Sequence, residues 1–73
     1  MNSIDTDNDI LCSLDNSLLR LTLNRPTKLN ALTSSMYERL ADEITQAQKN
    51  DMVRAILLDG IGDNFTAGND IAD

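Results

Sequence analysis

Residues 60–71 carry the groups whose types and spacing could do chemistry. This glycine-rich segment follows a short apolar run, so we expect a turn that leads from a buried strand into the start of a helix. Helix starts have free backbone N–H groups and the positive end of the peptide dipoles, which can hold an anion or a carbonyl oxygen about to become one. Gly68 has no Cβ and lets a ligand approach the backbone closely. The sequence therefore predicts that the backbone N–H of Asn69 points at a substrate oxygen.

Two other interpretations of this segment stay open from the residues alone. Gly60 and Gly62 after a strand match part of a dinucleotide-binding fingerprint, although that fingerprint needs a small residue where Phe65 stands and an acidic residue roughly 20 positions further on. A purely structural loop is the second alternative. We expect Phe65, the only phenylalanine, to fill the core beneath the turn.

The N-terminal half of the chain predicts a β-hairpin. Residues 10–14 are a short apolar run, and residues 18–24 alternate between apolar and polar side chains, which indicates a half-buried strand. Asp15 and Asn16 lie between the two runs and tolerate the left-handed backbone of a tight turn. Another element must cover the apolar face of the hairpin, which consists of Leu19, Leu21 and Leu23.

A helix and a second strand follow the hairpin. Thr33, Ser34 and Ser35 are candidate N-caps, and Ser35 with Glu38 fits a capping box, so the exact helix start is open. The helix extends to about residue 49, and its apolar stripe contains Met36, Leu40, Ile44 and Ala47, widened by Tyr37 and Ala41. Residues 53–59 are almost continuously aliphatic, as expected for a central parallel strand that is buried on both faces.

The composition excludes several classes of function. The chain has 73 residues, a formal net charge of −6, no histidine and one cysteine, Cys12. Nucleic-acid surfaces need clustered basic residues, zinc sites need several Cys or His ligands, and a membrane span needs about 20 apolar residues. We therefore expect no nucleic-acid partner, no metal and no membrane span. Residues 1–9 are polar and acidic and unlike a signal peptide. We interpret them as a flexible tail of a cytoplasmic protein, with residues 10–73 forming one domain.

The loop at residues 26–32 contains Lys28, one of six basic residues in an acidic chain. Composition favours a solvated lysine, but a contact to a phosphate or an adenosine-type group is the functional alternative.

Several short segments together resemble the opening of the enoyl-CoA hydratase/isomerase (crotonase) family, in its order and spacing, over roughly residues 10 to 73. These segments are Leu23-Asn24-Arg25-Pro26, Leu29-Asn30-Ala31-Leu32, Met36, Asp51-Met52-Val53-Arg54-Ala55-Ile56 and the run from Gly60 to Asp70. The resemblance implies an α/β fold, the crotonase (ClpP-like) ββα unit. Its parts here would be an N-terminal β-hairpin, a crossover helix, a buried parallel strand and a Gly-rich turn into a helix start.

The resemblance also implies a substrate and site residues. Family members bind acyl-CoA thioesters and stabilise a thioester enolate with two backbone N–H groups. Asn69, after Gly68, matches the position of the first N–H donor. The Ala67 carbonyl matches the position that meets the adenine ring, and Asp70 ends the motif. Three residues match the loop that lines the CoA moiety, and these are Lys28, Leu29 and Ala31.

The chain is shorter than members of this family, and the expectations for activity follow from that. The second N–H donor and the catalytic glutamates belong to later segments, and Glu38 and Glu43 lie on the crossover helix, where the motif has no catalytic role. We therefore expect an acyl-CoA-binding enoyl-CoA hydratase or isomerase that is inactive as this 73-residue piece. Coenzyme A is part of the substrate and no other cofactor is expected. The alternative is a non-catalytic remnant that associates with itself or binds CoA, and in either case a homo-oligomer is expected.

Overall fold

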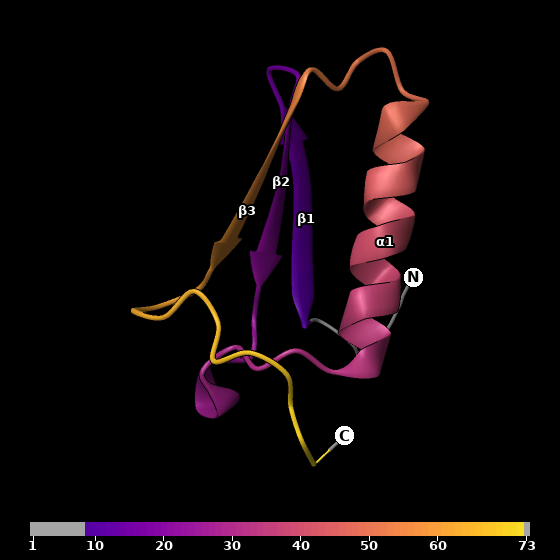
Figure 1. Cartoon of the computed structure of the whole chain (residues 1–73). Helices are drawn as coiled ribbons and strands as arrows, with labels where there is room; N and C mark the ends of the chain where they lie inside the picture. The colour runs from indigo at the N-terminus through magenta and orange to yellow at the C-terminus, as the bar shows by residue number, and fades with distance from the viewer. Residues whose placement is uncertain (1–8, 73) are drawn as a thin grey trace, which may run out of the picture.

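The computed structural model describes residues 9–72, which form a three-stranded sheet with a helix packed on one face (Figure 1). The predicted tail, apart from Asp9, lies outside these residues. The elements in chain order are β1 (Ile10–Asp15), β2 (Leu18–Leu23), the 3₁₀ helix η1 (Pro26–Lys28), α1 (Ser34–Gln48) and β3 (Ala55–Gly60). The order across the sheet is β1-β2-β3, with β1 and β2 antiparallel and β2 and β3 parallel. The predicted hairpin, helix and parallel strand are therefore all present.

The hairpin turn lies one residue later than the sequence predicts. Asp15 pairs with Leu18 in the antiparallel register, so the loop consists of Asn16 and Ser17. Both residues have positive φ, 51° and 68°, as a two-residue loop requires when its twist must match that of the strands. Asp15 belongs to β1 because it still has a pairing partner.

The core lies between the hairpin and α1. Leu19, Leu21 and Leu23 alternate along β2 and are 7%, 0% and 1% exposed, which confirms the predicted apolar face. The helix buries Met36, Leu40 and Ala47 against it. With about 100° of rotation per helical residue, these three lie within about 40° of one another.

The buried stripe of α1 is narrower than predicted. Ile44, Tyr37 and Ala41 are exposed, because they lie about 80°, 100° and 140° around the helix from Met36. The hairpin that α1 covers does not reach that far around it. Tyr37 instead lies beside the C-terminal segment, where its hydroxyl donates to Asn69 Oδ1.

Thr33 is the N-cap of α1. Its Oγ1 accepts the N–H of Met36 at 3.2 Å, and its own N–H donates to the Met36 sulfur at 3.5 Å. The predicted box of Ser35 and Glu38 is not formed, because the helix begins at Ser34 and the third helical position is Met36.

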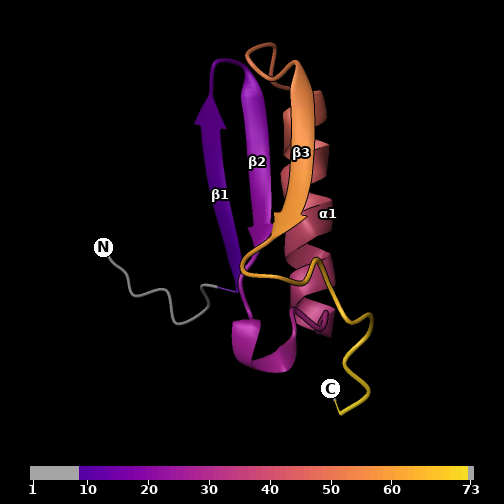
Figure 2. The same cartoon turned by 90° about the vertical axis from the view of Figure 1, so that its left-hand side faces the viewer.

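The expectation that residues 53–59 form a strand buried on both faces is wrong for β3. Ile56, Leu57 and Leu58 are 41%, 42% and 41% exposed. Within residues 9–72, only β2 pairs with β3, and the buried stripe of α1 packs on the hairpin. β3 is therefore an edge strand (Figure 2), and its apolar side chains are only half covered.

Candidate functional site

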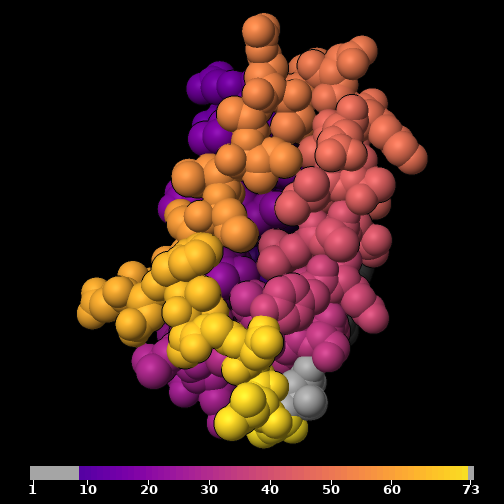
Figure 3. All heavy atoms as spheres, in the orientation of Figure 1, coloured from indigo at the N-terminus to yellow at the C-terminus, as the bar shows by residue number. Residues whose placement is uncertain are grey.

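Two loops meet at one end of the sheet. Residues 24–33 follow β2 and residues 61–72 follow β3, and the two strands are parallel, so their carboxyl ends lie at the same edge. The Leu32 N–H donates to the Gly68 carbonyl at 2.8 Å, and the Asp70 N–H donates to the Leu32 carbonyl at 2.9 Å. These two bonds form a parallel bridge between Leu32 and Asn69. In the space-filling view the C-terminal segment accordingly lies across the segment that leads into α1 (Figure 3).

The bridge determines the direction of the Asn69 amide. Leu32 bonds to the residues on either side of Asn69, and in a parallel bridge the central residue directs its own N–H and C=O away from the partner. No hydrogen bond among residues 9–72 uses the Asn69 N–H as donor. Gly68 precedes it with a φ of 98°, which only glycine adopts without strain. The Asn69 N–H is thus a hydrogen-bond donor with a fixed direction, and it points away from the bridge to Leu32.

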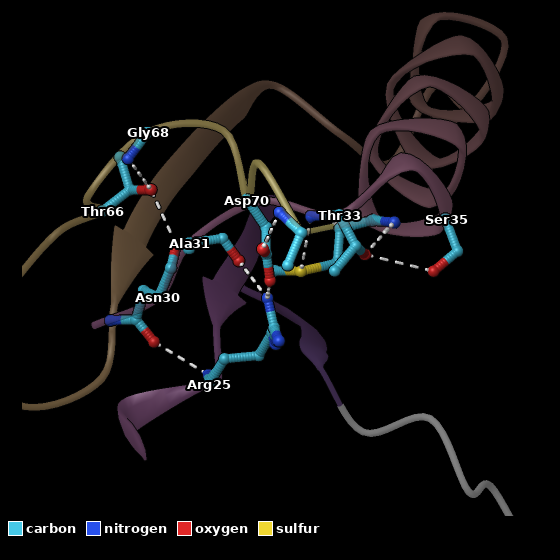
Figure 4. Close-up of polar contacts among 10 residues, drawn as sticks. Arg25, Asn30, Ala31, Thr33, Ser35, Thr66, Gly68 and Asp70 are labelled. Carbon is cyan, nitrogen blue, oxygen red and sulfur yellow. Dashed lines mark hydrogen bonds and ion pairs between the residues drawn. The ribbon is translucent and has the colours of Figure 1, made fainter. Parts of the chain in front are cut away.

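Asn30 connects the two loops and is only 1% exposed. Its Oδ1 accepts the Arg25 N–H at 2.8 Å, and its Nδ2 donates to the carbonyls of Ile61 at 3.0 Å and Asn64 at 2.7 Å. Its own carbonyl accepts the Thr66 hydroxyl at 2.6 Å, and Thr66 Oγ1 accepts the Gly68 N–H at 3.1 Å (Figure 4). This chain of bonds extends from the strand end at Arg25 to the glycine beside the proposed donor.

Arg25 makes a second connection between the loops. Its Nη1 donates to the Ala31 carbonyl at 2.7 Å and to Asp70 Oδ2 at 3.1 Å (Figure 4). The Arg25 and Asp70 side chains are 16% and 18% exposed. Arg25 and Asn30 were named from the sequence only within segments that resemble the family, and neither was predicted to have a role in the site. A further signal for Asn30 was its residue type, since asparagine tolerates the left-handed backbone, and here its φ is 58°.

The residues predicted to bind CoA are only partly brought together. Ala31 and Asp70 share the Arg25 guanidinium, and the Asp70 carboxylate also accepts the Ala72 N–H at 3.0 Å. Lys28, Leu29 and Ala67 are exposed. None of these three side chains makes a hydrogen bond to another part of residues 9–72. The Asp70 carboxylate thus has internal partners, whereas Lys28, Leu29 and Ala67 face solvent.

A hollow lies beside Asn69, between the start of α1 and the C-terminal segment. It has a volume of about 330 Å³ and is lined by Leu32, Ser34, Tyr37, Asn69, Asp70 and Ile71. Within it, the Tyr37 hydroxyl donates to Asn69 Oδ1. The sequence placed Tyr37 in the helical stripe, so this polar contact was missed.

One expectation for the glycine-rich segment is wrong in this structure. Phe65 is 52% exposed and fills no core, because the buried space at the turn is taken by the Asn30 side chain. Residues 61–72 form turns and a bridge, and the helix start expected after them stays a prediction. The first helical hydrogen bond needs four residues beyond its acceptor, and within the described residues only Ile71 and Ala72 follow Asp70. The bond from the Ala72 N–H to the Asp70 carboxylate is nevertheless the kind that an N-cap makes.

Neither glutamate of the described residues, Glu38 or Glu43, lies on the bridged loops, because both belong to α1. Glu43 lies on α1, where Arg39 donates to it at 2.9 Å and the Cys12 thiol at 3.7 Å. Across β2 and β3, hydrogen bonds from Arg20 and Thr22 hold the pKa of Asp59 below its usual range. No group of three His, Cys, Asp or Glu side chains in the described part is placed to hold a metal ion. No helix among the same residues is both long enough and apolar enough to cross a bilayer.

The fold and the bridged loops agree with the comparisons to known proteins. The sequence profile described as Enoyl-CoA hydratase/isomerase matches residues 18–73. The chain belongs to the enoyl-CoA hydratase/isomerase (crotonase) family, and its fold is the N-terminal ββα unit of that family.

Particular relatives show how much of the family fold is present. A crystal structure of an enoyl-CoA hydratase/isomerase from Pseudoalteromonas atlantica T6c superposes with a TM-score of 0.86 and 48% identity, over 89% of this chain and 26% of that one. The 1,2-epoxyphenylacetyl-CoA isomerase of Escherichia coli K12 is 39% identical over 88% of this chain and 24% of its own length. The small ribosomal subunit protein mS47 of Neurospora crassa is 36% identical over 93% of this chain and 14% of its own length. The chain thus spans between 14% and 29% of the length of such relatives.

Proposed function

We propose that this chain binds the thioester group of an acyl-CoA and donates the Asn69 N–H to the thioester oxygen. The observation that carries the proposal is the Leu32–Asn69 bridge, which leaves this N–H without an internal acceptor among residues 9–72 and directs it away from the ladder. Such a donor stabilises the negative charge that develops on the oxygen when a thioester becomes an enolate. The chemistry served is enoyl-CoA hydration or a double-bond shift, with coenzyme A as part of the substrate and no further cofactor.

The CoA moiety would lie against the exposed loop residues. Lys28 ends η1 with a solvated ammonium group, and Leu29 beside it is 54% exposed. An ammonium group suits a phosphate and an exposed leucine suits an adenine face, while the Ala67 carbonyl offers an acceptor. Ala31 and Asp70 act through their backbones and through Arg25.

The 73 residues alone are proposed to lack turnover. One N–H donor is worth about 2.7–4 kcal/mol of transition-state stabilisation, but hydration and isomerisation also need a positioned acid or base, which contributes about 10²–10⁴-fold. Neither Glu38 nor Glu43 lies at the bridged loops. The cytoplasm is the proposed compartment, because a single cysteine fits reducing conditions.

The test compares acyl-CoA with free CoA by NMR. Titration of the ¹⁵N-labelled chain with butyryl-CoA is expected to move the Asn69 amide resonance, whereas free CoA moves Lys28 and Leu29 only. Gly68→Ala should weaken butyryl-CoA binding about tenfold, a loss of about 1.4 kcal/mol. Gly62→Ala is the matched control, since both glycines have positive φ, 98° and 79°, and open space at the Cβ position. An Asn69 resonance that ignores butyryl-CoA at saturation, or appreciable turnover of crotonyl-CoA, would contradict the proposal.

The second candidate function is a self-associating, non-catalytic module, and the exposed edge of β3 favours it. The Ile61 N–H bonds to Leu23 across the parallel ladder. Because bonding alternates along a strand, the backbone groups of Ile56 and Leu58 point to the open edge. Such an edge, with half-exposed Ile56, Leu57 and Leu58, is a template for pairing with another copy.

Sedimentation velocity at micromolar concentration tests this homo-oligomer. We expect the chain to associate and Leu57→Lys to abolish the association. Leu11→Lys should preserve it, because Leu11, although 40% exposed, lies on β1 at the opposite edge of the sheet. A folded monomer at these concentrations would remove this candidate.

A further inference from the structure

We propose that Arg25 is a positioning residue, whose guanidinium fixes the Asn69 amide relative to the Lys28–Ala31 loop. The meaning of this inference rests on the proposed role of the Asn69 N–H, but its test does not require a ligand. Arg25 bonds to the Ala31 carbonyl and to the Asp70 carboxylate, so it would act on the Asn69 amide through these two neighbours of the bridge.

The first step of the argument is the geometry at one nitrogen. Arg25 Nη1 carries two hydrogens, and the structure gives it two acceptors, the Ala31 carbonyl at 2.7 Å and Asp70 Oδ2 at 3.1 Å. Ala31 is the neighbour of Leu32, and Asp70 is the neighbour of Asn69. The guanidinium thus joins the two residues that flank the Leu32–Asn69 bridge. Bridge and guanidinium together close a small ring, which resists rotation of the Asn69 peptide more than the bridge alone.

The second step is that Arg25 is itself held. Its N–H donates to Asn30 Oδ1 at 2.8 Å, and its carbonyl accepts the Asn30 N–H at 2.8 Å. Its side chain is 16% exposed, so its contact with Asp70 is shielded from water. A charged hydrogen bond in such a place is stronger and better defined than one on the open surface. Asn30 therefore holds Arg25 in place, and Arg25 in turn holds Asp70.

The third step is a comparison within the same molecule. Arg20 and Asp59 form another Arg–Asp pair, at 2.5 Å, but the Arg20 side chain is 54% exposed. That pair runs diagonally between β2 and β3, where the sheet already pairs Arg20 with Leu57 and Asp59 with Thr22. Removing it should cost stability without freeing a loop. It is the matched control for an effect specific to Arg25.

The experiment measures backbone order by ¹⁵N relaxation in the 73-residue chain. In the natural sequence, the order parameter of the Asn69 amide should be about 0.85, as in rigid backbone, and in Arg25→Gln it should fall below about 0.6. Leu21 serves as the internal reference and should not change. Arg20→Gln should leave the Asn69 amide as rigid as in the natural sequence.

Two further variants keep the test decisive if Arg25→Gln fails to fold. Arg25→Lys keeps the charge on a shorter group that reaches one acceptor at most, so it should lower the order of Asn69 by a smaller amount. Asp70→Asn keeps the shape and one hydrogen bond and should do the same. Unchanged order at Asn69 in any folded Arg25 variant, or an equal loss in Arg20→Gln, overturns the inference. Failure of butyryl-CoA to bind would instead overturn the proposed function, while the order parameters, measured without ligand, would still decide the role of Arg25.

Discussion

Gly60 lies against the side chain of Asn30: a Cβ on Gly60 would be 2.9 Å from Asn30 Nδ2, 2.4 Å from the Phe65 carbonyl and 2.6 Å from the Asn64 carbonyl. The end of β3 and the loop that follows it therefore fit together only if residue 60 has no side chain. This contact places the glycine-rich segment directly on the buried asparagine that joins the two loops.

Gly60→Ala should destabilise the chain by about 1–3 kcal/mol, because an extra carbon in a packed site forces the backbone to move. Two of the three clashing atoms are backbone carbonyls, which cannot rotate away as a side chain could. Urea unfolding followed by circular dichroism measures the change. The control is Gly62→Ala, where the Cβ meets nothing within 4 Å and only the positive φ is strained. Equal losses in the two variants would show that the contact at Gly60 is unimportant.

Asn30→Ala should cost more than about 2 kcal/mol, since it leaves the Arg25 N–H and the Ile61 and Asn64 carbonyls without their partner. Leu29→Gly is the comparison. Leu29 also has a positive φ, 53°, but is exposed, so glycine there should be neutral or stabilising. Urea midpoints compare the two variants, and a small effect of Asn30→Ala would mean that water replaces the amide.

Tyr37→Phe should loosen the Asn69 side chain and weaken butyryl-CoA binding about threefold. The lost hydroxyl bond to Asn69 Oδ1 is worth only about 0.5–1.5 kcal/mol, as expected for a partly exposed pair. Calorimetric titration measures the affinity. Thr45→Val removes another hydroxyl from the exposed side of α1 and should leave the affinity unchanged. If Tyr37→Phe binds butyryl-CoA as tightly as the natural sequence does, the hydroxyl contact to Asn69 plays no part in binding.

Asp59 should make the chain lose stability in acid. Hydrogen bonds from Arg20 and Thr22 lower the pKa of Asp59 in the folded state, below the unfolded value of about 3.9. The ionised carboxylate therefore stabilises the folded chain above about pH 4, and this contribution disappears as the pH falls through the folded pKa. Asp59→Asn should reduce the difference between urea midpoints measured at pH 7 and pH 3. The same difference in both proteins would show that other carboxylates cause the loss of stability in acid.

Cys12 should react slowly with alkylating reagents. Burial, and then the charge and hydrogen bond of Glu43, raise the pKa of its thiol, so little thiolate is present at neutral pH. Glu43→Gln should speed alkylation by iodoacetamide, followed by mass spectrometry, whereas Glu38→Gln on the same helix should not. An unchanged rate in Glu43→Gln would assign the whole effect to burial.

The alternation of Leu19, Leu21 and Leu23, the helical spacing of Met36 and Leu40, and the aliphatic run before Gly60 were enough to define the hairpin, the helix and the strand. These patterns are local, because each follows from the period of its own backbone. The resemblance of the short motifs to the crotonase family, which the comparisons confirm, added the order in which the elements are joined.

Tertiary contacts decided the rest. Whether β3 is central or at an edge depends on which strands pair beside it. The residue pattern within residues 55–60 does not predict those partners. The roles of Asn30 and Arg25 depend on partners up to 45 residues away. Only the pairing of Leu32 with Asn69 gives the Asn69 amide a direction, because an N–H has no direction until its neighbours are bonded.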